Sequence, residues 1–133
     1  MSLKKPSEQS IVNACLQLLA LRGAFAWRVN QGAIKTEGRF VRFNRVEGVS
    51  DIVGTLPIGW REIGPVVATV AERIQQGGRF IAVECKRPGL GKKSRPEPHQ
   101  QAFLDRIAAC GGLAVCVTDV RELDALLTAE GLL

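Results

Sequence analysis

Four polar residues and one lysine interrupt apolar stretches of this sequence, and their types indicate one kind of chemistry. Glu84 and Lys86 follow the apolar residues 80–83, and their shared parity puts both side chains on one side of an expected strand. Asp51 precedes the apolar pair Ile52-Val53. Carboxylates bind Mg²⁺ or Mn²⁺, which lowers the pKa of a bound water, and a lysine can orient that water and stabilise a phosphorane-like transition state. The set therefore indicates metal-assisted hydrolysis of a phosphodiester.

The other two polar residues stand at the starts of two expected amphipathic helices. Glu8 precedes Ile11, Val12 and Cys15 by three, four and seven residues, so it lies at the end of the inward helix face. Gln100 precedes an apolar stripe in the same way, formed by Phe103, Leu104 and Ile107. An acid and an amide thus join the first three residues in one candidate site.

Each of these residues also has an ordinary structural interpretation. Glu84 and Lys86 could form a satisfied ion pair at an exposed strand end. Asp51 could be a strand-entry aspartate, Glu8 a first-turn acid favoured by the helix dipole, and Gln100 a capping or surface amide. Their joint occurrence, rather than any one of them, favours a functional site.

The hydrophobic pattern predicts a single α/β domain. Residues 57–78 are ambiguous, because Val66, Val67 and Val70 favour a strand whereas Val66, Val70 and Ile74 repeat every four residues as on a helix; the segment is interpreted as an insertion with a short helix. Elsewhere the pattern predicts a helix at 7–22, strands at 24–33, 39–46, 50–56 and 79–86 with a turn at 36–38, a basic loop at 87–98, a helix at 99–110, a strand at 113–118 and a helix at 120–129.

Charge and composition suggest a basic protein with a surface for polyanions. The 133 residues are 46% hydrophobic, enough for one core, and 18 Lys+Arg against 13 Asp+Glu give a net charge of +5. The surplus lies at residues 22–45 and 86–95, whereas the end of the chain is acidic. Such a distribution suits nucleic acid, although a solvated face for solubility is the alternative. Neither a secretory signal nor an apolar run long enough for a membrane span is evident, so a cytoplasmic location is expected.

Cysteine and histidine usage argues against a zinc centre. The cysteines at 15, 85, 110 and 116 lack zinc-site spacing, and His99 is the only histidine. We expect the cysteines to be buried free thiols.

These motifs resemble those of a known nuclease superfamily. Ser50-Asp51 followed by Glu84-Cys85-Lys86 resembles the PD-(D/E)XK motif, with serine in place of proline. Over residues 8–120 the chain is similar to the small stand-alone virus-type replication-repair nuclease (VRR-NUC) domains. The similar stretches are Glu8 in the first helix, Trp27-Arg28-Val29-Asn30, Gly48-Val49-Ser50-Asp51-Ile52, Ile81 to Lys86, and Pro98-His99-Gln100-Gln101-Ala102-Phe103.

The resemblance implies a fold and a set of active-site residues. The fold would be a restriction-endonuclease-like core (αβββαβ), a mixed central sheet flanked by helices, in one domain over residues 1–133 with the insertion at 57–78. Asp51, Glu84 and the Cys85 carbonyl oxygen would bind Mg²⁺ or Mn²⁺, and Glu8 would support the metal directly or through water. Lys86 would be the catalytic lysine, and Gln100 the family's helix glutamine near the active site.

The implied activity is that of a metal-dependent DNA endonuclease in phage or bacterial replication, repair or recombination. With seven aromatic residues in the chain, no stacking platform is evident, so duplex or branched DNA is the expected substrate. A homodimer is expected because cutting two strands needs two sites, and Ile63, Val66, Val67 and Val70 could form its interface or complete the core. The residues expected to contact DNA are Arg28, Lys35, Arg39, Arg42, Arg45, Arg87, Lys92, Lys93 and Arg95.

Two alternatives remain at this level. The chain could be a non-catalytic nucleic-acid-binding module that retains the nuclease fold, although the presence of Asp51, Glu84 and Lys86 together argues against it. It could also be a hydrolase of RNA with the same site.

Overall fold

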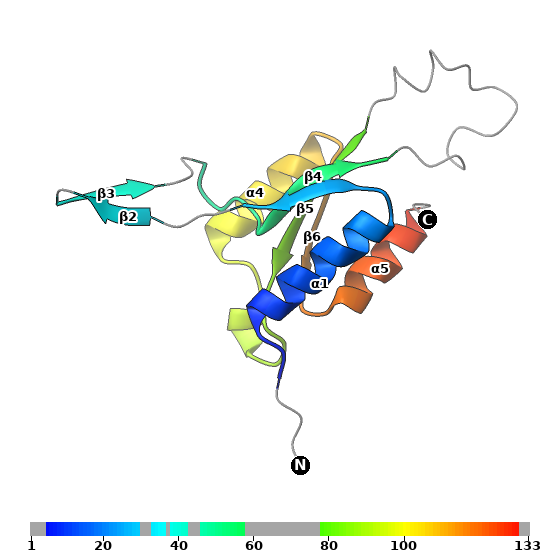
Figure 1. Ribbon diagram of the computed structural model, residues 1–133, viewed down its shortest axis with the longest axis horizontal. Helices are drawn as coiled ribbons and strands as arrows, with labels where there is room; N and C mark the ends of the chain where they lie inside the picture. The colour runs from blue at the N-terminus through cyan, green and yellow to red at the C-terminus, as the bar shows by residue number, and fades with distance from the viewer. Residues whose placement is uncertain (1–4, 30–32, 37, 43–45, 58–77, 131–133) are drawn as a thin grey trace, which may run out of the picture.

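The computed structural model describes residues 5–29, 33–36, 38–42, 46–57 and 78–130. Its elements (Figure 1) are, in chain order, α1 (Glu8–Leu21), β1 (Phe25–Arg28), β2 (Ala33–Thr36), β3 (Arg39–Arg42), β4 (Ile52–Leu56), β5 (Arg79–Cys85), the 3-10 turn η1 (Gly91–Ser94), α4 (Pro98–Ala109), β6 (Leu113–Val117) and α5 (Val120–Ala129).

A four-stranded mixed sheet forms the centre of the fold, in the order β1-β4-β5-β6. β1 and β5 both pair antiparallel with β4, whereas β5 and β6 are parallel and are joined through α4. α1 and α5 lie side by side on one face of the sheet, and α4 covers the other (Figure 1). The predicted α/β class, with a mixed sheet flanked by helices, is therefore confirmed.

The alternation of side chains along β5 creates two cores. Ile81, Val83 and Cys85 pack with α1 and α5 in the larger cluster, whereas Ala82 packs with Leu104 of α4 in the smaller one. Because both faces of β5 are covered, its apolar residues show no alternation with polar ones. Glu84 has the parity of Ala82 and so belongs to the α4 face.

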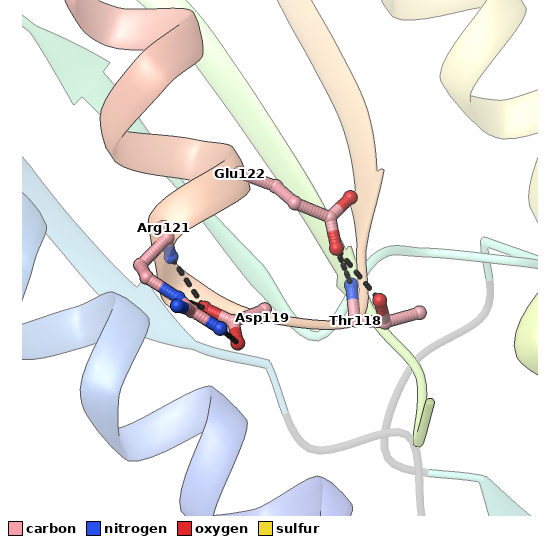
Figure 2. Close-up of polar contacts among 4 residues, drawn as sticks. All are labelled: Thr118, Asp119, Arg121 and Glu122. Carbon is pink, nitrogen blue, oxygen red and sulfur yellow. Dashed lines mark hydrogen bonds and ion pairs between the residues drawn. The ribbon is translucent and has the colours of Figure 1, made fainter. Parts of the chain in front are cut away.

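Helix ends agree with the sequence signals to within one residue. Ser7 Oγ accepts a hydrogen bond from the main-chain nitrogen of Ser10 at the start of α1. Figure 2 shows the start of α5, where Asp119 Oδ1 accepts from the main-chain nitrogen of Arg121 at 2.8 Å. Glu122 Oε1 accepts from both the nitrogen and Oγ1 of Thr118, at 3.1 and 2.6 Å. These local bonds hold the turn between β6 and α5.

The expected strand over residues 24–33 is divided in two. β1 ends at Arg28, and β2 begins at Ala33. Directly after β1, the main-chain nitrogen of Val29 donates a 2.8 Å hydrogen bond to the main-chain oxygen of Asp51. Among the described strands, β2 and β3 pair with each other alone and project from the main sheet as a separate hairpin (Figure 1). Both strands of the hairpin have β propensity. Of the described segments that replace the expected strand, however, β1 alone pairs with a strand of the central sheet.

Some expectations are corrected or lie outside the described residues. Cys15 and Cys85 are buried as expected, but Cys116 is half-buried and Cys110 is exposed because it follows the last turn of α4. Residues 58–77, which contain the candidate dimer residues Ile63, Val66, Val67 and Val70, lie outside the described residues, as does Glu37 of the predicted turn. Within the described residues, no helix has the length and hydropathy needed to cross a bilayer.

Candidate functional site

The two candidate carboxylates meet across neighbouring strands. In the antiparallel β4–β5 pair, Ile52 lies opposite Val83, and continuing this register by one residue puts Asp51 opposite Glu84. Asp51 Oδ2 also accepts a 2.7 Å hydrogen bond from the main-chain nitrogen of Cys85. Directly opposed residues point to the same side of a sheet, so Asp51 and Glu84 share the α4 face.

Glu84 is a buried carboxyl group, and of its two oxygens one has a partner that offsets the cost of burial. Its side chain is 2% exposed, Oε1 lies 3.6 Å from Lys86 Nζ, and Oε2 is buried without a hydrogen-bond partner among the described residues. Burial, and then the charge of Asp51, raise the pKa of Glu84 to about 8, against the opposing effect of Lys86. The ion pair of the ordinary interpretation is therefore present, but the Lys86 side chain is only 13% exposed, so this strand end is not exposed as that interpretation supposed.

An orphaned carboxylate oxygen beside a second carboxylate is a suitable position for a divalent cation. Within the described part of the chain, no three His, Cys, Asp or Glu side chains form a group that could hold a metal ion. A metal here would therefore be held by the side chains of Asp51 and Glu84 and completed by main-chain oxygen, for which the Cys85 carbonyl is the candidate. Hard oxygen donors of this kind fit Mg²⁺ or Mn²⁺.

Glu8 lies near this pair without joining it as a third member of a ligand group. It is the exposed first residue of α1, and its charge contributes to the raised pKa of Glu84. Its side chain lines the same cavity as Lys86. A supporting role for Glu8 through water thus stays a prediction.

Gln100 has the capping role that was one of its two interpretations. Its Oε1 accepts a 2.8 Å hydrogen bond from the main-chain nitrogen of Glu97, within a capping box at the start of α4. The side chain is half-buried, and its part in an active site remains a prediction.

Gly48 is a positioning residue; it belongs to the similar stretch 48–52, but the sequence assigned it no role. Its φ is +70°, and a Cβ at this position would lie 2.1 Å from the main-chain oxygen of His99. Only glycine permits this approach, which holds the loop before Asp51 against the first turn of α4. The neighbouring Ser50, which replaces the motif proline, is fully buried, and no residue that the structure describes forms a hydrogen bond with its Oγ.

A basic cavity of about 730 Å³ opens beside Lys86, where both α1 and α4 begin. The loop around it is organised by Ser94 Oγ, which donates to the Arg87 oxygen at 2.5 Å and accepts from the Leu90 nitrogen at 2.9 Å. The two carboxylates Glu8 and Glu97 stand among the cations of its lining. Those cations are Lys86, Arg87, Lys92, Lys93 and Arg95.

The structure thus brings together one of the two predicted groups of DNA-contacting residues. Arg87, Lys92, Lys93 and Arg95 surround the cavity. Arg28 is elsewhere, on the α1 side of the sheet, where its Nη1 donates to Gln9 Oε1. By their backbone positions Lys35, Arg39 and Arg42 belong to the β2–β3 hairpin, and Arg45 lies outside the described residues.

The sequence matches no protein-family model, and neither a curated protein nor a solved structure is significantly similar to it. A functional assignment therefore depends on the chemistry of the site itself.

Proposed function

We propose that this chain is a metal-dependent endonuclease that hydrolyses phosphodiester bonds of DNA. The observation that carries the proposal is the pair Asp51 and Glu84, opposed across β4 and β5, with an orphaned buried oxygen on Glu84 and Lys86 Nζ 3.6 Å from its other oxygen. A buried carboxylate oxygen without a partner is costly, and a cation bound between Glu84 and Asp51 would offset that cost.

The order of elements supports a restriction-endonuclease-like core. Without the β2–β3 hairpin, the chain runs α1, β1, β4, β5, α4, β6, which is the αβββαβ order. Asp51 precedes the second core strand, Glu84 lies near the end of the third, and Lys86 directly follows it, as the resemblance to VRR-NUC domains implies. The order and the motif positions together are the basis for proposing this family.

Each residue has a defined role in the proposed mechanism. A Mg²⁺ or Mn²⁺ ion held by Asp51, Glu84 and the Cys85 carbonyl would lower the pKa of a bound water and neutralise developing charge on the phosphate. The Cys85 main-chain nitrogen holds Asp51 Oδ2 at 2.7 Å, so Asp51 is oriented before any ligand binds. Lys86 places its ammonium beside Glu84, where it can orient the attacking water and stabilise negative charge on the scissile phosphate.

Glu84 must lose its proton for this arrangement to work. With a pKa of about 8 it retains the proton at neutral pH, because burial and Asp51 disfavour its charged form. A divalent cation favours the ionised carboxylate, so cation binding and proton release from Glu84 are linked. The basic cavity beside Lys86 would then hold the DNA backbone by contacts that position it without reading bases.

A cleavage panel tests the proposal. Linear, nicked, flapped, forked and four-way DNA are incubated with Mg²⁺, Mn²⁺, Ca²⁺ or EDTA and either wild-type protein or Glu84→Gln. The matched control is Glu130→Gln, which makes the same change at the opposite end of β5, where Glu130 Oε2 lies 2.8 Å from Arg79 Nη1.

We expect cleavage with Mg²⁺ and Mn²⁺, binding alone with Ca²⁺, and a loss of activity by orders of magnitude in Glu84→Gln but not in Glu130→Gln. Robust cleavage in excess EDTA, or undiminished cleavage by Glu84→Gln, would overturn the mechanism. Binding of DNA without any cleavage by the wild type would favour the non-catalytic module.

A further inference from the structure

The cavity beside Lys86 is more than a cationic surface. Five cations in its lining stand against two carboxylates, Glu8 and Glu97. The lining is therefore cationic on balance and suits an anionic group such as a phosphate.

The same cavity has an apolar side. Leu90, Pro96 and Pro98 line it, and Leu90 is 39% exposed, so part of its apolar surface is accessible to a ligand. The Leu90 position is determined by its own loop, since its main-chain nitrogen donates to Ser94 Oγ at 2.9 Å. Apolar walls with a few convergent polar groups are typical of small-ligand sites.

The volume of the cavity suits a single nucleotide better than a base pair. About 730 Å³ is within the range of pockets that enclose drug-sized ligands, and a mononucleotide belongs to that class. A base in a duplex is stacked and paired, so it could enter such a pocket only after extrusion. That extrusion costs a few kcal/mol and is least costly for a base that is already single-stranded.

We propose that this cavity binds one unpaired nucleotide of the substrate strand, with its phosphate at the cations and its base and sugar against Leu90 and the prolines. Lys86 belongs both to the cavity and to the Asp51–Glu84 site, so this nucleotide neighbours the bond to be cleaved. The inference rests on the proposed nuclease function and deepens it. It makes DNA with an unpaired nucleotide beside the cleavage position the preferred substrate class.

The test measures binding in EDTA, so that its result does not depend on catalysis. The protein is titrated into a labelled single-stranded oligonucleotide and into a blunt duplex of the same sequence, and anisotropy is recorded. A deoxynucleoside 5′-monophosphate and inorganic phosphate are then used as competitors. We expect tighter binding of the single strand, and competition by the mononucleotide at about tenfold lower concentration than by phosphate.

Two variants test the apolar and the cationic side of the cavity separately. Leu90→Ala should abolish the advantage of the mononucleotide over phosphate, and Leu21→Ala is its control, since Leu21 is 85% exposed at the far end of α1. Lys92→Ala with Lys93→Ala should weaken competition by both ligands. Its control, Arg106→Ala with Arg121→Ala, removes two positive charges from exposed helix positions outside the lining.

Equal competition by mononucleotide and phosphate in the wild type, or an unchanged preference in Leu90→Ala, would overturn the nucleotide site while leaving a nuclease intact. Conversely, absence of cleavage in the metal panel would refute the nuclease while the binding result in EDTA still decided the role of the cavity.

Discussion

The main-chain nitrogen of Cys85 donates a 2.7 Å hydrogen bond to Oδ2 of Asp51, across 34 residues of sequence. This bond joins the residue before β4 to the last residue of β5. It orients one carboxylate of the candidate site through the backbone of the segment that carries the other. Asp51 therefore combines a structural role with its proposed role as a metal ligand, and substitutions can separate the two.

Asp51→Asn should retain the fold but not the cleavage. Asparagine keeps a side-chain oxygen that can accept from the Cys85 nitrogen, whereas Asp51→Ala leaves that donor without this partner. We expect urea unfolding to show a free energy of unfolding about 1–3 kcal/mol lower for Asp51→Ala, and one close to that of the wild type for Asp51→Asn. Both should lose cleavage by orders of magnitude. Asp105→Asn, an exposed change on α4, is the control, and full activity of Asp51→Asn would count against a metal-ligand role.

The metal-free protein should lose stability through Glu84 as the pH rises. The folded pKa of about 8 lies above the ordinary value of 4.5, so protonated Glu84 favours the folded state. This contribution is fully present below about pH 4.5 and is lost as the pH rises through about 8. In thermal unfolding in EDTA, the Tm of Glu84→Gln should rise relative to that of the wild type between about pH 5 and pH 9. Parallel curves for the two proteins would contradict the raised pKa.

Gly48→Ala should be far more harmful than a similar change at another positive-φ glycine. The new Cβ would lie 2.1 Å from the His99 oxygen, whereas Gly111, at φ +92°, has nothing within 4 Å of its Cβ position. Gly111→Ala should lower the free energy of unfolding by only about 1–2 kcal/mol, the cost of holding an alanine at a positive φ. Gly48→Ala should lower the free energy of unfolding in urea by clearly more than this. It should also reduce cleavage, since it displaces the loop that leads to Asp51. Equal costs for the two variants would show that the contact with α4 is not close.

A single cysteine should react rapidly with a thiol reagent in the native protein. Cys110 is exposed, Cys15 and Cys85 are buried, and burial raises the pKa of Cys116 to about 11, which keeps its thiol protonated. A hydrogen bond with Cys15, together with burial, also raises the pKa of Cys85. Mass spectrometry after brief labelling should find one modification, and none in Cys110→Ser. Two or more rapid modifications of the wild type would show that a core thiol is accessible.

Local signals in the sequence determined the elements and the direction of key side chains. The period of two along a strand put Glu84 and Lys86 on one side, and Lys86 Nζ does lie 3.6 Å from Glu84 Oε1. The expected helix starts near residues 7 and 120 agree with α1 and α5, which Ser7 and Asp119 cap, because capping depends only on residues within one turn. The apolar run of residues 80–83 likewise identified β5 as a central strand.

Tertiary structure decided what depends on contacts between distant segments. The pairing of β1 with β4, and not with the hairpin, follows from a register that no local pattern encodes. The opposition of Asp51 and Glu84, the burial that raises the pKa of Glu84, and the approach of Gly48 to His99 all arise from strand pairing and helix packing. The cavity beside Lys86 exists for the same reason, because α1, α4 and the basic loop meet only when the sheet brings their ends together.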